Sequence, residues 1–414
     1  MDRENKKKKR IAFINQRYGR EVNGGSESYT MQIVQHLKSD YEVEVLTSKA
    51  LTYDKWEDYY KEDAEEIDGI KVRRFGVKRK RNRYVQRLLK ILITRFGCNS
   101  LWMTALWNKV LGPYVPGLVD YIEANRDAYD VFIFVTYMYY PAVFGMEKVK
   151  DKAVFVPTAH DEYNIYFKIY EKMFHIPQKI VYLTEEERTF AERKFHNEEV
   201  EHKVIGIGID LPEHVDAERF RKKYGIEGEY IIYAGRVDEE KGCGEMFAFF
   251  QRYAEEKKRA GKHNSMAEKK GSNGENVYQG MHLVVLGKKY MEIPDRPDIH
   301  YLGFVSDEDK YDGMAGAAVL WLPSQYESLS ISVLEAMALG KPVIVNGKCD
   351  VLRGHCERSG GGLWYEEYGS FAYAMEELLG EHYSFYCEKA RVYVEENYRW
   401  DGVAGEWHNI INNC

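Results

Sequence analysis

One feature of the sequence restricts most strongly how this chain can fold: short apolar runs alternate with longer stretches that have the period of a helix. The first half contains five such runs, at Ile11–Asn15, Glu42–Thr47, Val131–Val135, Ala153–Pro157 and Ile180–Leu183. The second half contains five more, at Tyr230–Ala234, His282–Leu286, Ile299–Leu302, Val319–Leu322 and Pro342–Val345. Helical patterns such as Ser26–Lys38 and Ser330–Leu339 lie between them. Because strand and helix alternate in both halves, the order predicts parallel sheets covered by helices.

A break between the two series of strands predicts two domains. The apolar, glycine-containing piece 204–209, followed by Asp210 and Pro212, has the character of a linker. We therefore predict an α/β fold of two Rossmann-like, doubly wound domains, 1–205 and 206–385, that face each other across a cleft. The remaining residues, 386–414, are expected to form a helix that packs back on the N-terminal domain.

Composition places the chain among globular proteins without a membrane span. Of its 414 residues, 44% are hydrophobic and 30% are charged. The longest stretch without a charged side chain, 131–146, has 16 residues, short of the roughly 20 apolar residues that cross a bilayer. The apolar run that follows the basic first ten residues is too short for the core of a signal peptide. We therefore expect a cytoplasmic protein.

Net charge and cysteine spacing exclude two further classes. A net charge of -7 disfavours general nucleic-acid binding, which needs a basic face, so no nucleic acid is expected as a partner. The cysteines are far apart and form no CxxC pair, so neither a zinc ribbon nor a disulfide framework is indicated. Reduced, mostly buried thiols are expected at Cys98, Cys243, Cys349, Cys356, Cys387 and Cys414.

Charge is segregated within the first hundred residues. The stretch 54–68 carries eight acidic and two basic side chains, whereas 71–95 carries eleven Lys or Arg and no acid. With Leu88, Leu89 and Ile91 among its apolar residues, the second stretch is typical of a basic amphipathic helix that could lie on an anionic membrane surface. A solvated helix face is the alternative. The polar stretch Glu255–Gly280 lacks an apolar period and is expected to be a mobile insertion.

Functional residues are expected beyond the carboxyl ends of strands, where doubly wound sheets bind ligands. After the first strand, Gly24 and Gly25 precede a helix that begins near Tyr29. Two glycines there would let the backbone approach an anion at the helix N-terminus, although such a pair is also a common turn. The spacing matches neither GxGxxG nor a Walker A loop, which disfavours a dinucleotide oxidoreductase and a P-loop NTPase.

A charged loop follows the strand Tyr230–Ala234. Its sequence is Gly-Arg-Val-Asp-Glu-Glu-Lys-Gly, so that Arg236 and Lys241 bracket a tight loop at the end of the strand. A guanidinium fork and a point cation in this arrangement could hold a diphosphate between them. The alternative is that both are solvated loop residues.

A pair of carboxylates follows the strand Val319–Leu322. Glu327 precedes a short helix and Glu335 lies within it, while Gly340 and Pro342 end it. The two carboxylates could accept hydrogen bonds from hydroxyls of one polyol ligand, and the N–H groups of 328–330 could face its phosphate. Acidic capping together with one amphipathic-helix glutamate is the alternative.

These residues resemble a known family. Glu327 and Glu335 with seven residues between them, followed by Ala-Met-Ala-Leu-Gly-Lys-Pro-Val, look like the EX7E motif and its helix in retaining GT-B glycosyltransferases of family 4. Supporting segments recur in order over nearly the whole chain, at Gly24-Gly25 with Glu27, 158–162, 234–236, 241–242, 285–287 and 301–305. The resemblance implies the GT-B fold, with the acceptor on the N-terminal domain and the nucleotide sugar mainly on the C-terminal domain.

The resemblance also implies a role for each matched residue. Arg236 and Lys241 would neutralise the diphosphate, where charge builds as the glycosidic bond breaks. Glu335 would hold the ribose, while Glu327 and His160 would contact the donor sugar. The implied catalytic set is His160, Glu327, Arg236 and Lys241. The implied nucleotide-sugar-binding set is Gly24, Gly25, Arg236, Lys241, Phe304, Val305, Ser328, Leu329, Ser330 and Glu335, in which the backbone near Phe304 and Val305 would meet the base.

One departure from the common form of the motif, and the absence of metal-binding patterns, refine these expectations. The chain has Ser328-Leu329-Ser330 where many family members have Gly-Phe-Gly, which puts the identity of the donor sugar in question more than the reaction type. No DxD pair or His/Cys cluster stands out, so we expect no metal or other cofactor. We expect retaining, front-face transfer in which the leaving diphosphate helps to deprotonate the acceptor hydroxyl.

The acceptor is expected to be a saccharide or a lipid-linked saccharide in the synthesis of surface polysaccharide or glycoconjugates. The donor would be a UDP- or GDP-linked sugar, and the basic segment 71–95 would bring the protein to the inner face of the plasma membrane. Two other classes stay open. One is a non-catalytic nucleotide-sugar-binding or scaffold protein, and the other is a nucleotide-sugar epimerase, which would turn over donor without acceptor.

Overall fold

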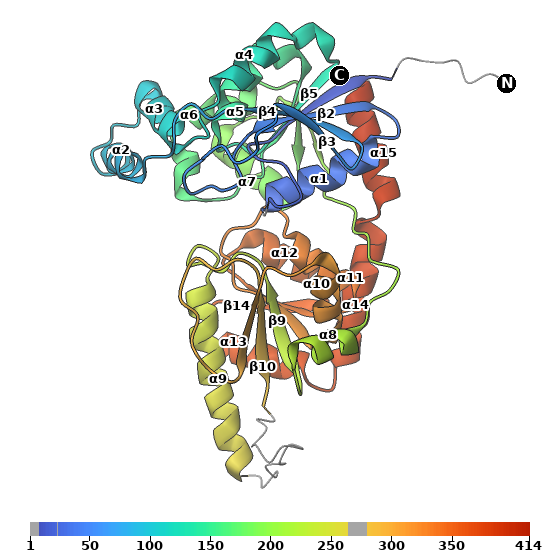
Figure 1. Ribbon diagram of the computed structural model, residues 1–414. Coiled ribbons are helices and arrows are strands. Elements are labelled where there is room, and N and C mark those ends of the chain that lie inside the picture. The colour runs from blue at the N-terminus through green and yellow to red at the C-terminus, as the bar shows by residue number, and fades with distance from the viewer. Residues whose placement is uncertain (1–7, 23, 264–279) are drawn as a thin grey trace, which may run out of the picture. The chain divides into compact units, whose positions relative to one another are not determined.

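The computed structural model of the chain describes residues 8–22, 24–263 and 280–414. The chain divides into two compact units. One contains the residues up to Ile207 together with Trp400–Cys414, and the other is Gly208–Arg399. Each unit has its own sheet flanked by helices (Figure 1), which confirms the predicted α/β class with two Rossmann-like units.

The first unit is built on a sheet whose strand order is β3-β4-β2-β1-β5-β6-β7-β8. The strands are β1 (Arg10–Ile14), β2 (Glu42–Ser48), β3 (Ala64–Ile67), β4 (Ile70–Phe75), β5 (Val131–Val135), β6 (Ala153–Val156), β7 (Lys179–Tyr182) and β8 (Glu201–Val204). Only β3 pairs antiparallel with its neighbour; the other pairs are parallel. Every residue of β5 is buried, as expected where helices cover both faces of a parallel sheet.

Helices and short 3-10 turns connect these strands. They are α1 (Gly25–Leu37), α2 (Arg83–Arg95), α3 (Leu101–Leu111), α4 (Pro116–Ala124), η1 (Arg126–Ala128), α5 (Tyr140–Gly145), η2 (Met146–Lys148), η3 (Lys150–Lys152), η4 (Tyr163–Tyr166), α6 (Lys168–Glu171), η5 (Met173–His175), α7 (Glu185–Phe195) and α15 (Trp400–Asn412). The boundaries of α7 follow from capping. The Thr184 hydroxyl accepts the Glu187 N–H at the start, and left-handed His196 ends the helix.

The second unit has an all-parallel sheet in the order β11-β10-β9-β12-β13-β14. Its strands are β9 (Tyr230–Ala234), β10 (His282–Leu286), β11 (Ile299–Gly303), β12 (Val319–Leu322), β13 (Val343–Asn346) and β14 (Gly362–Tyr365). Its helices are α8 (Ala217–Tyr224), α9 (Cys243–His263), α10 (Asp307–Gly316), α11 (Ile331–Ala338), α12 (Asp350–Ser359), α13 (Tyr368–Leu378) and α14 (Tyr383–Asn397).

The C-terminal segment is divided between the units. Helix α14 packs on α11 within the second unit, so the expected boundary between 385 and 386 falls inside a helix. Helix α15 belongs to the first unit, where it packs on α1. There the Trp400 ring stacks on His36 with centroids 3.4 Å apart, and Trp407 is buried near Phe13. The return to the first unit is therefore made by α15 alone.

Two expectations about segments need correction. The basic stretch 71–95 is not one helix, because its first five residues belong to β4 and only Arg83–Arg95 form α2. Alternating burial along β4 shows why, since Val72 and Arg74 face inward next to β2. The polar stretch expected to be a mobile insertion begins as helix, since α9 runs to His263. The rest of that stretch, 264–279, lies outside the described residues.

Each sheet has one position where the strand order reverses. In the first sheet β1 lies between β2 and β5, and in the second β9 lies between β10 and β12. The connections that leave the carboxyl ends of such a pair run to opposite sides, which opens space for a ligand. The glycine pair Gly24-Gly25 follows β1, and the loop 235–242 follows β9.

Candidate functional site

The loop after β9 is packed tightly against its neighbours at the carboxyl edge of the second sheet. A side chain at Gly287, which follows β10, would meet the Gly235 carbonyl oxygen at 1.8 Å, and one at Gly242 would meet the Pro323 carbonyl oxygen at 2.4 Å. Both glycines also have positive φ, 129° and 75°. The glycines of this loop and its neighbours therefore allow the ends of β9, β10 and β12 to converge.

The two cations of this loop have carboxylate partners. Arg236 forms ion pairs with Asp238 and, at 2.9 Å, with Glu240. Lys241 Nζ lies 2.6 Å from Glu327 Oε1, so the loops after β9 and β12 meet through this pair. The side chains of Lys241 and Glu327 keep 28% and 15% of their surface exposed. A ligand phosphate could therefore reach Lys241 from solvent and share it with Glu327.

The segment between Glu327 and α11 contains a residue whose backbone conformation favours glycine. Ser330 is the N-cap of α11 and has φ 67° and ψ 78°, a left-handed conformation that glycine adopts without strain. Its side chain is nearly buried, and Oγ has no hydrogen-bond partner among the described residues. The serine thus brings an additional hydroxyl to the start of the helix at some cost in backbone strain.

Glu335 is held by two residues that sequence reasoning missed. Its Oε1 accepts from Lys310 Nζ at 2.8 Å and from the Tyr311 hydroxyl at 2.9 Å, both on α10. Burial lowers the pKa of Lys310, but the Glu335 carboxylate outweighs it and the pKa is raised overall. Burial together with Glu335 raises the pKa of Tyr311. The contact joins residues 25 positions apart, and no local spacing in the sequence indicates it.

The predicted base contacts follow β11. Phe304 comes directly after the strand and keeps 68% of its surface exposed, while Val305 is half-buried. The Gly303 carbonyl accepts the Gly287 N–H at 2.7 Å, which joins this strand end to that of β10. An exposed aromatic face at the carboxyl edge could stack on a base. The structure brings the strand ends that carry Arg236, Lys241, Glu327 and Phe304 to one edge of one sheet.

The glycine pair in the first unit covers a buried carboxylate. Glu27, in the first turn of α1, is fully buried and accepts from Arg17 Nη2 at 2.7 Å, Gln16 Nε2 at 2.9 Å and the Tyr53 hydroxyl at 2.7 Å. A side chain at Gly24 would lie 2.2 Å from Glu27 Oε2. Gly24 is therefore required by the packing of Glu27, whatever the loop binds.

His160 lies in the loop after β6, close to a second carboxylate. Its Nε2 is 3.6 Å from Glu162 Oε1, and the Tyr137 hydroxyl donates to the same oxygen. Burial and Glu162 raise the pKa of Tyr137 well above its usual value. The loop is fixed from beneath by Glu187, which accepts the Ala159 N–H at 2.5 Å. Glu162 is two positions from His160, so the sequence could have suggested the pair.

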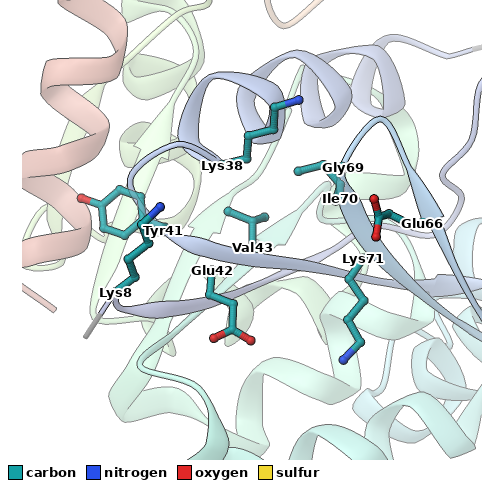
Figure 2. A pocket seen from close by; sticks show the side chains of 9 residues that line it. All are labelled: Lys8, Lys38, Tyr41, Glu42, Val43, Glu66, Gly69, Ile70 and Lys71. Carbon is teal, nitrogen blue, oxygen red and sulfur yellow. The ribbon is translucent and has the colours of Figure 1, made fainter. Parts of the chain in front are cut away.

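A hollow in the first unit lies away from these residues. It has a volume of about 430 Å³, and its lining includes Lys38 at the end of α1, Glu42 at the start of β2 and Lys71 near the start of β4 (Figure 2). Lys38 donates to the Asp68 carbonyl at 2.8 Å. None of the predicted site residues lines this hollow.

In 8–22, 24–263 and 280–414, no group of three or more His, Cys, Asp or Glu side chains is arranged to hold a metal ion. No helix in the same ranges is long and apolar enough to span a membrane. All six cysteines are free thiols; Cys243, Cys349 and Cys356 are buried and the others half-buried.

Comparison with known proteins bears on the second unit and on the fold. Residues 216–400 match the model of the family described as glycosyl transferases group 1. An uncharacterized glycosyltransferase of Methanocaldococcus jannaschii is 26% identical over 200 residues, which are 46% of this chain and 47% of that protein, so the match spans less than half of that relative.

Solved structures match over almost the full length. Sucrose-phosphate synthase from Thermosynechococcus elongatus has a TM-score of 0.70 and 15% identity, with 98% of each chain covered. HepE of Anabaena in complex with UDP-glucose has a TM-score of 0.67 and 13% identity, with 98% of this chain and 100% of that chain covered. At these identities the likeness shows the fold. Residues 216–400 are therefore similar to glycosyl transferases of group 1, and over its full length the chain has the GT-B fold.

Proposed function

We propose that this chain transfers a sugar from a nucleotide diphosphate sugar to a saccharide or lipid-linked saccharide acceptor, with retention of anomeric configuration, in the synthesis of surface polysaccharide or glycoconjugates. One observation carries the proposal. The Lys241–Glu327 pair joins two strand-end loops beside the start of α11, at the edge of the sheet where doubly wound folds bind ligands. The family match covers this same unit.

The cations would act on the leaving group. When the bond from the sugar to the diphosphate breaks, negative charge grows on the phosphate oxygens, and cations already in place lower the barrier. Arg236 and Lys241, on the loop after β9, would be these cations. Their charge is also the reason for proposing that the reaction needs no divalent metal or other cofactor. Each cation already has a carboxylate partner, which holds it in position for a phosphate.

The carboxylates would recognise hydroxyl groups. In this proposal Glu335 holds the ribose, Glu327 holds hydroxyls of the donor sugar, and the backbone at 304–305 meets the base. Lys310 and Tyr311 would hold the Glu335 carboxylate in place for the ribose hydroxyls. HepE of Anabaena, which shares the fold, is described with UDP-glucose, and this supports a UDP-linked donor.

Retention would come from attack on the face that the diphosphate leaves. The acceptor oxygen forms its bond to the anomeric carbon as the bond to the phosphate oxygen breaks, and the proton of the acceptor hydroxyl passes to the departing phosphate. In this scheme no side chain needs to act as nucleophile. His160 would contact the donor sugar, and Glu162 would fix the orientation of its ring.

Calorimetric titration with UDP, GDP and ADP tests the donor site. We expect the protein to bind one of these nucleotides selectively and Arg236→Ala to weaken that binding by about tenfold or more, because a charge-assisted hydrogen bond to phosphate is lost. Arg252→Ala is a matched control, since Arg252 likewise pairs with a glutamate four positions later. Equal loss in both variants would contradict the assignment of Arg236.

Product measurements separate the competing functions. With the matching sugar nucleotide, a transferase consumes donor faster when acceptor saccharides are present, whereas an epimerase makes product from donor alone. A scaffold protein would bind the nucleotide without any turnover. We expect acceptor-dependent consumption, and failure to find it across lipid-linked and free saccharides would favour the scaffold.

We propose further that the protein works on the cytoplasmic side of a membrane, at which it is peripheral. Helices α2 and α3 pack on each other in the first unit (Figure 1). Side chains on these helices and on the segment between them form an exposed apolar surface. The exposed side chains are Tyr84, Val85, Leu88, Ile91, Phe96, Leu101 and Trp102, with Tyr84 89% and Trp102 70% exposed. Arg87 and Arg95 lie among them. Aromatic and basic side chains together suit an anionic lipid surface.

Vesicle sedimentation tests this surface. We expect the protein to bind vesicles that contain phosphatidylglycerol, to bind less at high salt, and to lose binding when Leu88→Ser and Trp102→Ser are combined. Tyr373→Ser is the matched control, because Tyr373 is also exposed but belongs to α13 of the second unit. Binding that survives the double change would contradict the proposed surface.

A further inference from the structure

A buried histidine contacts the loop between Glu327 and α11 from inside the second unit. His355 lies on α12 and is fully buried. Its Nε2 is 2.7 Å from the Leu329 carbonyl oxygen, and its Nδ1 is 3.1 Å from the Tyr393 hydroxyl. The ring therefore links the loop to helix α14.

The direction of these hydrogen bonds follows from what each atom can do. A carbonyl oxygen only accepts, so Nε2 of His355 must carry the hydrogen. In the neutral ring Nδ1 then accepts, and the Tyr393 hydroxyl donates to it. Burial favours the neutral ring and lowers the pKa of His355 to about 4. The aromatic rings of Tyr393 and Tyr398 and the charge of Arg358 face the imidazole, while the Leu329 carbonyl approaches it from the loop.

The chain of hydrogen bonds continues beyond Tyr393. Its hydroxyl oxygen lies 3.2 Å from the Tyr398 hydroxyl and 3.3 Å from Arg358 Nε, both of which can donate to it. The Tyr398 carbonyl in turn accepts the Ile209 N–H at 2.9 Å, near the start of the second unit. His355 is thus fixed by groups on α12, α14 and the chain that enters the unit.

Because of the geometry of the peptide bond, the hydrogen bond from His355 to the Leu329 carbonyl also sets the direction of the Ser330 N–H. The Leu329 carbonyl and the Ser330 N–H belong to one planar trans peptide, so they point in opposite directions. A group that holds the carbonyl from the interior therefore sends the Ser330 N–H away from the interior. Ser330 caps α11 in a left-handed conformation, which further limits how this peptide can turn.

We infer that His355 is a positioning residue, which aims the Ser330 N–H at the diphosphate of the donor by holding the Leu329 carbonyl. The inference rests on the donor site proposed above. His355 does not itself touch the ligand, so its effect should appear in nucleotide binding and in the mobility of the loop.

Two replacements of similar size separate the two contacts of the ring. In His355→Gln the amide nitrogen lies near the position of Nε2 and can still donate to Leu329. In His355→Asn the side chain reaches only the position of Nδ1, so the contact with Tyr393 is retained and the contact with Leu329 is lost. A residue with a merely structural role would lose stability in both variants without distinguishing between them.

Hydrogen exchange and calorimetry measure the difference. We expect amides 328–334 to exchange about tenfold faster in His355→Asn than in His355→Gln, and the nucleotide that the wild type binds among UDP, GDP and ADP to bind about tenfold more weakly, the loss typical of one buried hydrogen bond. Equal exchange and equal affinity in the two variants would overturn the inference.

The experiment distinguishes a wrong mechanism from a wrong function. If the wild type binds none of the three nucleotides, the proposed donor site fails, while hydrogen exchange still decides whether His355 orders the loop. If both His355 variants unfold, Tyr393→Phe takes their place, because it keeps the ring and removes the hydroxyl that donates to Nδ1. Faster exchange of 328–334 in that variant supports the inference, and unchanged exchange contradicts it.

Discussion

Each unit has a glutamate in a connection that follows the carboxyl end of a strand, and the surroundings of the two glutamates differ. In the first unit Glu27 lies just after the switch-point strand β1, is fully buried, and accepts from Arg17, Gln16 and Tyr53. In the second unit Glu327 is partly exposed, and among the described residues its only ion pair is with Lys241. The first carboxylate is saturated by the protein, whereas the second retains oxygen atoms that a ligand can approach.

The difference shows that position in a doubly wound fold does not by itself make a ligand group. A buried carboxylate whose oxygens are taken by fixed donors holds its loop together, and a ligand could reach it only by breaking those bonds. An exposed ion pair costs less to open, because solvent screens the separated charges. Replacing residues of the two clusters should therefore damage stability in the first unit and ligand binding in the second.

The largest expected effect is on the stability of the first unit. Glu27→Ala leaves the buried guanidinium of Arg17 without its counter-charge, and we expect the free energy of unfolding to fall by about 3–5 kcal/mol. Burial by itself lowers the pKa of the Arg17 guanidinium, whereas Glu27 raises it. Urea unfolding followed by tryptophan fluorescence measures the loss, since Trp56 and Trp107 are buried in this unit.

Glu42→Ala is the matched control for this cluster. Glu42 pairs with Arg10 at 3.1 Å, but its side chain is 60% exposed. An exposed pair of this kind contributes about 0–1 kcal/mol. A similar loss in both variants would contradict the view that burial makes Glu27 structural, and nucleotide affinity that falls with Glu27→Ala at unchanged stability would assign it to a site.

The second effect is on the proposed reaction and leaves stability nearly intact. Lys241→Ala removes a cation from the place where charge develops on the diphosphate, and we expect turnover to fall by about 10²–10³-fold. Thermal unfolding should barely change, because the Lys241 pair is partly exposed. Lys257→Ala is the control, since Lys257 pairs with Glu376 at 2.5 Å in the same unit, on α9. Unchanged turnover in Lys241→Ala would remove the residue from the site.

The sequence predicted the parts of both units that depend on local pattern. The runs at 131–135, 230–234, 282–286 and 319–322 became strands with the predicted bounds, because buried parallel strands are short apolar segments that are visible without their neighbours. Strands β3, β4, β8 and β14 were missed, and all but β4 lie at the edge of a sheet. In β3 (Ala64–Ile67) and β8 (Glu201–Val204) exposed residues alternate with half-buried ones, and this pattern resembles an exposed loop.

The same division applies to the site. The sequence suggests Arg236, Lys241 and Glu327 as site residues because each lies in a short motif at a strand end. The residues that hold those motifs were not found. Lys310 reaches Glu335 from another helix, and His355 reaches Leu329 across 26 positions. Such contacts depend on how helices pack on the sheet, and the sequence of one chain carries no local sign of them.

The next smaller effect is a dependence of the stability of the first unit on pH, caused by the buried carboxyl group of Glu187. Burial raises the pKa of Glu187 from 4.5 to about 8, against the bonds it accepts from the Leu183 and Ala159 N–H groups. The folded state therefore keeps a proton that the unfolded state releases, and stability present at low pH is lost as pH rises through the folded pKa. At about 1.4 kcal/mol for each pH unit, we expect unfolding of the first unit to cost about 2 kcal/mol less at pH 7.5 than at pH 6.

Glu187→Gln removes the titrating proton and keeps the size of the side chain. The variant should therefore show a flatter dependence of the free energy of unfolding on pH, with the difference from wild type concentrated between the two pKa values. A difference that does not change with pH would show that Glu187 is ionised in both states. Activity at high pH provides a second measurement, because Glu187 also holds the loop that contains His160 by accepting the Ala159 N–H.

The smallest expected effects on stability come from replacing strained residues that follow strands, one in each unit. Thr158 before His160 has φ 50°, and Ser330 before α11 has φ 67°. Thr158→Gly should stabilise the first unit by about 1 kcal/mol and Ser330→Gly the second by less, because a β-branched residue tolerates left-handed backbone worst, while glycine's freedom in the unfolded chain offsets part of each gain. Urea unfolding measures both. Since Ser330 Oγ is buried without a partner among the described residues, Ser330→Gly should also change nucleotide affinity. If it stabilises the unit and leaves the affinity unchanged, the strained serine has no part in binding, and the loop depends on its backbone N–H groups alone.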